Sequence, residues 1–208
     1  MNLDILRTPL TKLKNKQPVL GNLQSSIDAR IKQAAKFIED IERNTTWYIE
    51  RYESKKHKKE QVEYETKEAI ELFGVPQKTV IPGNIMLNEG INNLWTVVCS
   101  SGGTKYDATN SYLGVGDSTA AEVATQTGLL GTNKTYKAVM SGYPTYGTNQ
   151  KATWKSSFES ADANYAWNEF SLSTTNSNTG INLNRKVSSQ GTKQSGQTWE
   201  LTLEVTLS

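Results

Sequence analysis

The sequence predicts an α+β protein in which an N-terminal arm and long helices precede an antiparallel β-sandwich of the jelly-roll or immunoglobulin-like type. Charge is concentrated at the start of the 208-residue chain: residues 1–80 hold 15 basic and 12 acidic side chains, whereas residues 81–208 hold 8 and 9. Apolar residues recur at helical spacing in the first part and alternate in the second. Charge-dense sequence favours solvated helices, and alternation favours half-buried strands.

Residues 1–24 are predicted to form a docking arm. Pro9 and Pro18 prevent one continuous helix, and so short a segment buries little surface against itself. Its apolar residues are therefore expected to dock on a partner. They are Leu3, Ile5, Leu6, Leu10 and Leu13. The alternative is a terminus that docks on nothing.

Residues 25–75 are predicted to form a helical anchor or stalk. Ser25 can cap a helix, and the positions after it step by four and three residues in turn, which is the spacing of a coiled-coil seam. The expected oligomer or anchor face consists of Ile27, Ile31, Ala34, Ile38, Ile41, Tyr48 and Tyr52. The alternative is an amphipathic helix that packs on its own domain. A second helix is expected over residues 60–73, ended by Gly74 and Pro76.

Four lysines, from Lys55 to Lys59, surround the single histidine, His57. Such a run can bind phosphates, but no aromatic residue or nucleic-acid motif accompanies it, so a solvated helix face or turn is the preferred interpretation. Nucleic acid is therefore not an expected partner. No apolar run approaches the roughly 18 residues that span a bilayer, and no secretory signal is visible at the start, so no membrane partner is expected.

Residues 76–84, which include Pro76, Pro82 and Gly83, are predicted to be a linker, and residues 85–208 to form the β-sandwich. A short helix is expected over residues 85–98. Residues 151–158 and 199–207 alternate between apolar and polar side chains, as half-buried strands do. Weaker strand candidates cover residues 112–116, 135–140, 165–172 and 181–187. About six antiparallel strands with turns between them suggest a sandwich or barrel.

No combination of residues predicts a catalytic site, a cofactor site or a metal site. A single histidine excludes a multi-His metal centre, and a single cysteine, Cys99, excludes an internal disulfide framework. Gly114 and Gly116 form a G-x-G pattern without the third glycine and following helix of a dinucleotide site, so a β-turn is expected there. The acidic residues are too scattered for an acid–base pair or a calcium loop. The chain is therefore not expected to be an enzyme.

Five aromatic side chains of the β-domain could stack on sugars or bases, although aromatic residues at strand spacing more often belong to a core. They are Tyr143, Tyr146, Trp154, Tyr165 and Trp167. These residues are the basis of an alternative function, a receptor- or glycan-binding module.

Eight segments of residues 85–208 carry a resemblance. They are residues 87–90, 113–118, 125–129, 142–144, 154–158, 161–169, 182–187 and 199–208. In this collinear order they resemble a family of tailed-bacteriophage virion structural proteins. The resemblance implies a small head-fibre, decoration or fibre-type protein, and it brings no catalytic residues with it.

The resemblance and the predicted arm and helices together predict a capsid decoration or head-fibre protein. Residues 1–75 would dock on the particle, and the β-domain would project from it. The expected partners are viral structural proteins, such as the major capsid protein or a neighbouring virion protein, and further copies of the chain, with a trimer favoured. The expected location is the virion, assembled in the host cytoplasm. A tail or neck component is the main alternative, and a carbohydrate- or peptidoglycan-degrading enzyme ranks last.

Overall fold

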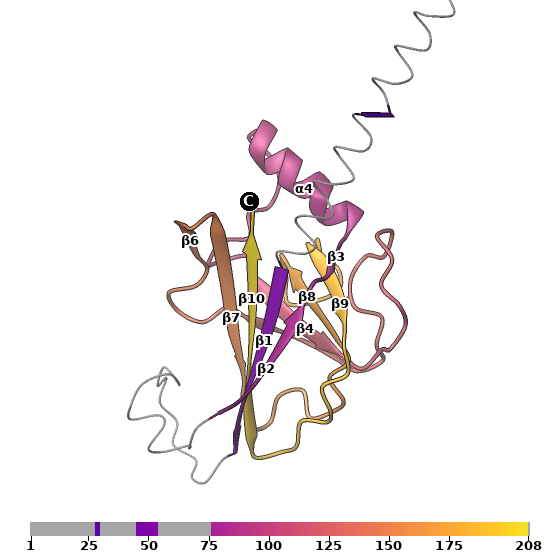
Figure 1. Cartoon of the computed structure of the whole chain (residues 1–208), viewed down its shortest axis with the longest axis vertical. Helices are drawn as coiled ribbons and strands as arrows, with labels where there is room; N and C mark the ends of the chain where they lie inside the picture. The colour runs from indigo at the N-terminus through magenta and orange to yellow at the C-terminus, as the bar shows by residue number, and fades with distance from the viewer. Residues whose placement is uncertain (1–27, 30–44, 54–75, 208) are drawn as a thin grey trace, which may run out of the picture. The chain divides into compact units, whose positions relative to one another are not determined.

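The computed structural model describes residues 28–29, 45–53 and 76–207 of the chain. The chain divides into two compact units, residues 1–40 and 41–208. In the first unit, Asp28 and Ala29 are described, and both are helical. The second unit contains two antiparallel sheets of five strands each (Figure 1).

Sheet 1 has the strand order β2–β1–β10–β7–β6. Its strands are β2 (Gln77–Pro82), β1 (Thr45–Glu53), β10 (Gln197–Thr206), β7 (Lys151–Phe158) and β6 (Thr145–Thr148). Strand β1 pairs with β10 along its whole length, from Thr45 opposite Val205 to Glu53 opposite Gln197. The first described strand of the sandwich therefore lies beside the last one.

Sheet 2 has the strand order β3–β9–β8–β4–β5. Its strands are β3 (Ile85–Met86), β9 (Asn184–Val187), β8 (Glu169–Ser173), β4 (Tyr112–Gly116) and β5 (Lys134–Ala138). Helix α4 (Asn88–Cys99) follows β3 and is the one helix within residues 45–53 and 76–207. Residues 117–133, between β4 and β5, are called the cover loop below.

The core lies between the two sheets and is rich in aromatic rings. Trp47 of sheet 1 and Phe170 of sheet 2 approach to 5.8 Å between ring centroids. Trp167 packs edge-on against Phe158 at 4.8 Å and against Trp199 at 4.9 Å. All five rings are buried, and large rings in edge-to-face contact dominate the packing of such a core. The two sheets therefore form a β-sandwich around one core.

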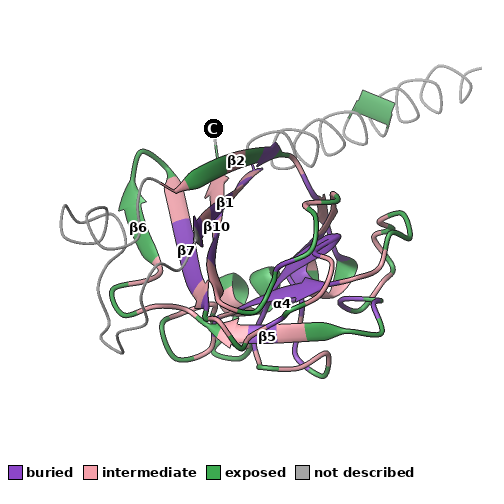
Figure 2. Ribbon diagram, turned by 90° about the horizontal axis from the view of Figure 1, so that it is seen from below, coloured by how far each residue is buried: buried purple, intermediate pink, exposed green. Residues whose placement is uncertain are grey.

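The border strands of sheet 1 face solvent. Figure 2 shows β2 and β6 coloured mainly as exposed, at the two ends of the row of strands. Strand β2 carries Lys78 and Pro82, residue types that discourage another chain from pairing with an open edge. The β2 border is thus protected against uncontrolled strand addition.

The expectation of long helices before the sandwich is wrong, because residues 45–53 of the predicted stalk form a strand. Residues 45–53, where the heptad spacing continues through Tyr48 and Tyr52, form strand β1. Aromatic and β-branched residues fill this segment, and they favour a strand when a partner strand is present. Trp47 and Ile49 alternate toward the core. Tyr48 and Tyr52 therefore do not belong to a helical oligomer face.

The sandwich also begins earlier than expected. Residues 76–84, expected to be a linker, contribute β2, which pairs with β1 from Arg51 to Thr46. The strand expectations for residues 112–116 and 151–158 coincide with β4 and β7, and the expected final strand overlaps β10. The expected arm (residues 1–24), the run from Lys55 to Lys59 and the helix over residues 60–73 lie outside the described residues.

Candidate functional site

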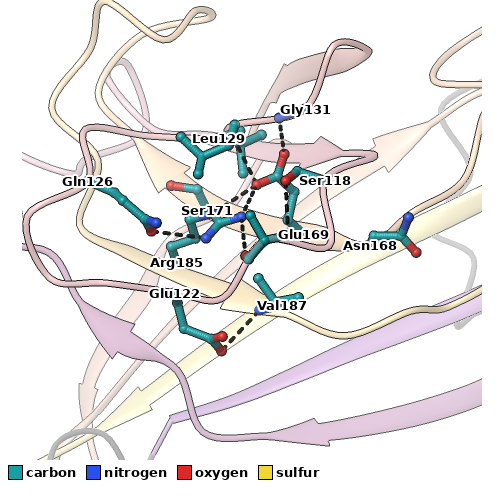
Figure 3. Close-up of polar contacts among 12 residues, drawn as sticks. Ser118, Glu122, Gln126, Leu129, Gly131, Asn168, Glu169, Ser171, Arg185 and Val187 are labelled. Carbon is teal, nitrogen blue, oxygen red and sulfur yellow. Dashed lines mark hydrogen bonds and ion pairs between the residues drawn. The ribbon is translucent and has the colours of Figure 1, made fainter.

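The most enclosed ion pair of the described residues joins Glu169 of β8 and Arg185 of β9 (Figure 3). Neither side chain has exposed surface. Arg185 Nη2 lies 2.7 Å from Glu169 Oε2, and Arg185 Nε donates to the same oxygen at 2.8 Å. Desolvation of two charges is costly, so a buried pair is stable only when its remaining polar atoms are also satisfied. The other partners of the pair therefore show its role.

Those partners all lie in the cover loop. Glu169 accepts hydrogen bonds from the backbone N–H groups of Leu130 at 3.0 Å and Gly131 at 2.6 Å. The guanidinium of Arg185 donates to three oxygens of the same loop, those of Ala120, Ala121 and Gln126. All five N–H groups of the guanidinium and both carboxylate oxygens are thus engaged. The pair fixes the cover loop on sheet 2 and has no capacity left for a substrate.

Tyr136 of β5 contacts the same loop, because its hydroxyl accepts a hydrogen bond from the N–H of Leu129 at 3.5 Å. Its ring lies against Gly114, where a Cβ would collide with it. Its hydroxyl donates to Asn178 Oδ1, and burial raises the pKa of the phenol above its ordinary value. Gly114 and Gly116, expected to form a β-turn, lie in strand β4 instead. Their lack of side chains makes room for Tyr136 and Glu169, so the G-x-G pattern serves packing.

A second charge cluster lies in sheet 1, and three of its four side chains are buried while Lys78 is half exposed. Lys155 Nζ is 2.8 Å from Glu200 Oε2 and 3.3 Å from Glu50 Oε2. Lys78 Nζ lies 3.3 Å from the other oxygen of Glu50. Two cations and two carboxylates from four neighbouring strands thus neutralise one another. The cluster joins strands β2, β1, β10 and β7, and its charges are compensated within the sheet.

Lys193 is a further buried cation. Its Nζ donates to the carbonyl oxygen of Glu159 at 2.7 Å and to Asn164 Oδ1 at 3.0 Å. Burial lowers the pKa of the Lys193 amine to about 8. A lysine with a lowered pKa can act as a nucleophile, but Lys193 has no exposed surface. Its two hydrogen bonds hold the loop from Glu159 to Asn164 in place.

Metal-ligating side chains do not gather in the described part of the chain. No three His, Cys, Asp or Glu side chains there lie close enough to hold a metal ion. Cys99 is exposed at the end of α4. Within the same residues, no helix has the length and apolar character needed to cross a membrane.

The aromatic residues proposed for a glycan platform do not form one surface. Trp154 and Trp167 belong to the core. The hydroxyl of Tyr165 donates inward, to the carbonyl oxygen of Val115 and to Thr135. Tyr146 is 77% exposed, on border strand β6. Tyr143, three residues before Tyr146, is half-buried. Two of the five rings are thus in the core and one is exposed, so the five residues do not form one stacking platform.

The predicted anchor and arm residues lie almost wholly outside the described part. Ile27, Ile31, Ala34, Ile38 and Ile41 are outside it, as are the arm residues Leu3, Ile5, Leu6, Leu10 and Leu13. Of the named face, the structure describes Tyr48 and Tyr52. Tyr52 is 1% exposed, so it offers no surface to another copy.

The feature that sequence reasoning missed is the direction in which α4 points its apolar face. Gly90 and Asn93 face the sandwich and are buried, whereas Trp95 and Val98 are 55% and 72% exposed. The sequence predicts one apolar band in this segment but not its outward direction. Gly90 was the available signal, because a glycine inside a helix marks a close approach of backbone.

Comparison with known proteins identifies no relative of this chain: no family model, no curated protein and no solved structure matches it. The satisfied internal charges and the open face of α4 are therefore the features from which a function can be argued.

Proposed function

We propose that this chain is a structural protein of a tailed-bacteriophage virion, a capsid decoration or head-fibre protein that works by assembly and not by catalysis. The proposal rests on the difference between the buried charged side chains, which are all engaged, and the apolar side chains that α4 exposes. The buried ion pair and the buried cations described above are held by structural partners, while α4 presents Trp95 and Val98 to solvent. Apolar surface of this kind marks interaction sites.

The resemblance of residues 85–208 to virion structural proteins supports the same conclusion. The sandwich supplies the rigid module that such a protein needs, and within each sheet a buried ion pair joins two neighbouring strands. Residues 1–24 would supply the apolar arm that docks on the capsid. The β-domain then projects from the particle surface.

Particles of the phage that encodes this chain provide the direct test. An antibody raised against the full chain, detected by immunogold electron microscopy on gradient-purified particles, is expected to label the head surface. Label at the tail or neck would instead support the tail or neck assignment. Absence of the chain from purified particles, by labelling and by mass spectrometry, would refute the virion proposal.

The docking arm is tested separately with particles assembled without this protein. The added full chain is expected to bind them, and a chain lacking residues 1–24 is expected to fail while keeping the circular dichroism spectrum of its sandwich. Equal binding by both chains would show that docking does not use the arm.

A further inference from the structure

A buried lysine lies in direct contact with a side-chain amide between the strands of the sandwich. Lys193 has no exposed surface, and its Nζ is 3.0 Å from Asn164 Oδ1. The Cγ atom of Asn164 is one C=O bond beyond that oxygen, so Nζ and Cγ are at most about 4.2 Å apart. Reacting atoms about 3–3.5 Å apart are in position to form a bond. Burial keeps external substrates from the amine, but the amide of Asn164 is already beside it.

The backbone and a second hydrogen bond hold the two side chains in this arrangement. The N–H of Lys193 donates to the carbonyl oxygen of Tyr165, the residue after Asn164, at 3.1 Å. The Nδ2 of Asn164 donates to the carbonyl oxygen of Ser160 at 2.9 Å. With Nδ2 used in this way, Oδ1 is the amide atom that faces the lysine. The carbonyl group of the amide is therefore directed at the amine.

The environment of Lys193 favours the reactive form of its amine. Only a neutral amine is a nucleophile. Burial lowers the pKa of the Lys193 amine to about 8, so about a tenth of it is neutral at pH 7. Conversion of the amine into an amide removes the buried charge altogether, and with it the cost of keeping that charge out of water. The product is thus better suited to this buried position than the free lysine.

Asp162 supplies a carboxylate beside the same pair. Its backbone N–H donates to the carbonyl oxygen of Glu159 at 2.9 Å, and that oxygen also accepts from Lys193 Nζ at 2.7 Å. The negative charge of Asp162 acts on the amine. Its side chain is held by the N–H of Glu159 at 3.0 Å and by Lys137 Nζ at 2.9 Å. A positioned carboxylate of this kind can accept and return a proton.

We propose that Lys193 and Asn164 form an intramolecular isopeptide bond in the folded chain, with Asp162 as the proton relay. The neutral amine attacks Asn164 Cγ, so that the Nζ–Cγ bond forms and the Cγ–Nδ2 bond breaks. One Nζ proton passes through Asp162 to the departing nitrogen, which leaves as ammonia. No oxidant, reductant or cofactor is consumed, and the reaction occurs once in each chain. The inference goes beyond the proposed virion role and does not rest on it.

The bond joins the two connections that carry the chain between the sheets. Residues 159–168 lead from β7 in sheet 1 to β8 in sheet 2, and residues 188–196 lead from β9 back to β10. Asn164 lies in the first connection and Lys193 in the second. A link between them encloses β8 and β9 in a covalent ring, which restricts the unfolded chain and so favours the folded one.

The first test measures the mass of the purified full chain. Because ammonia is released, the wild-type chain is expected to be lighter than its sequence by about 17 Da. Trypsin is expected to yield a branched peptide in which residues 156–185 are joined to residues 187–208 through Asn164 and Lys193. A wild-type chain that keeps its full mass after several days in the folded state would overturn the proposal.

Variants separate this bond from other losses of ammonia, such as a succinimide formed at an asparagine. Lys193→Arg keeps the positive charge and Asn164→Ala removes the electrophile, and both are expected to keep the full mass with the near-ultraviolet circular dichroism of the wild type. Lys151→Arg is the matched control, because it makes the same exchange at a part-exposed ion pair, and it is expected to lose ammonia as the wild type does. A mass loss that persists in Lys193→Arg, or a wild-type digest without the branched peptide, would overturn the proposal.

The role of Asp162 is tested by the same measurement. Asp162→Asn is expected to slow formation of the bond at least about a hundredfold, so that most of the purified variant has the full mass. A variant that is linked as completely as the wild type would overturn the assignment of Asp162 as the proton relay.

Discussion

At the scale of single residues, the chain uses its few buried charges to hold backbone in place. Arg185 reaches two backbone carbonyls and one side-chain amide of the cover loop, and Glu169 binds two N–H groups of the same loop. The sequence shows these two charges in a charge-poor region but not their pairing. Their partners lie 38 to 65 residues away in the chain, and no local pattern indicates a contact of that separation.

The first prediction concerns this pair. Glu169→Gln leaves the Arg185 guanidinium buried without its counter-ion, and it is expected to lower the free energy of unfolding by about 3–5 kcal/mol. Urea denaturation followed by tryptophan fluorescence measures the change. Glu204→Gln is the control: Glu204 pairs with Lys151 at 2.8 Å on a part-exposed surface, where an ion pair contributes about 1 kcal/mol or less.

A double-mutant cycle completes this test. If the two charges act as a unit, Glu169→Gln combined with Arg185→Met costs less than the sum of the two single variants. Strict additivity, or a cost for Glu169→Gln no larger than that of the control, would contradict the structural role of the pair.

At the scale of elements, local spacing alone did not decide between helix and strand. Tyr48 and Tyr52 continue a heptad series, yet Trp47, Ile49 and Arg51 alternate with them just as well. Residues 45–53 form a strand because they pair with β10 over nine residues. Strand β10 lies about 150 residues later in the sequence, so a local pattern cannot reveal this pairing. Strand β7 was predictable because its alternation has no competing helical spacing.

The second prediction concerns helix α4. Alanine normally stabilises a helix relative to glycine by about 1 kcal/mol. Gly90→Ala is expected to do the opposite and to destabilise the chain by about 1–3 kcal/mol, since its Cβ would lie 2.5 Å from Leu183 Cα in backbone that cannot easily move. Thermal unfolding measures the sign directly.

Gly102→Ala is the matched control for that change. The nearest atom to a Cβ at Gly102 is Ser100 Oγ at 3.5 Å, an ordinary contact, so this variant is expected to unfold within about 0.5 kcal/mol of the wild type. A stabilising effect of Gly90→Ala would mean that α4 does not pack tightly on residues 182–183, and the outward direction of Trp95 and Val98 would lose its support.

At the scale of the whole molecule, the order of strands makes the sandwich depend on residues that the sequence assigned to a stalk and a linker. Strand β1 lies between β2 and β10, and it contributes Trp47 and Ile49 to the core. The sandwich class and its central strands were predictable from alternation. The domain start was not, because two of the five strands of sheet 1 begin before the change in composition near residue 80.

The third prediction follows from that order. A fragment of residues 41–208 is expected to unfold in one cooperative transition, whereas a fragment of residues 85–208 is expected to be unfolded or aggregated. Removing β1 and β2 turns β10 into an open border strand and uncovers the side of the core formed by Trp199, Leu201 and Leu203, and long apolar borders recruit other chains. Near-ultraviolet circular dichroism and sedimentation of the two fragments measure the difference.

A peptide of residues 41–53 added to the shorter fragment provides the control, because the missing strand should restore part of the native signal if its loss is the cause. Cooperative unfolding of residues 85–208 alone would show that the sandwich folds without β1 and β2. The domain would then begin at residue 85.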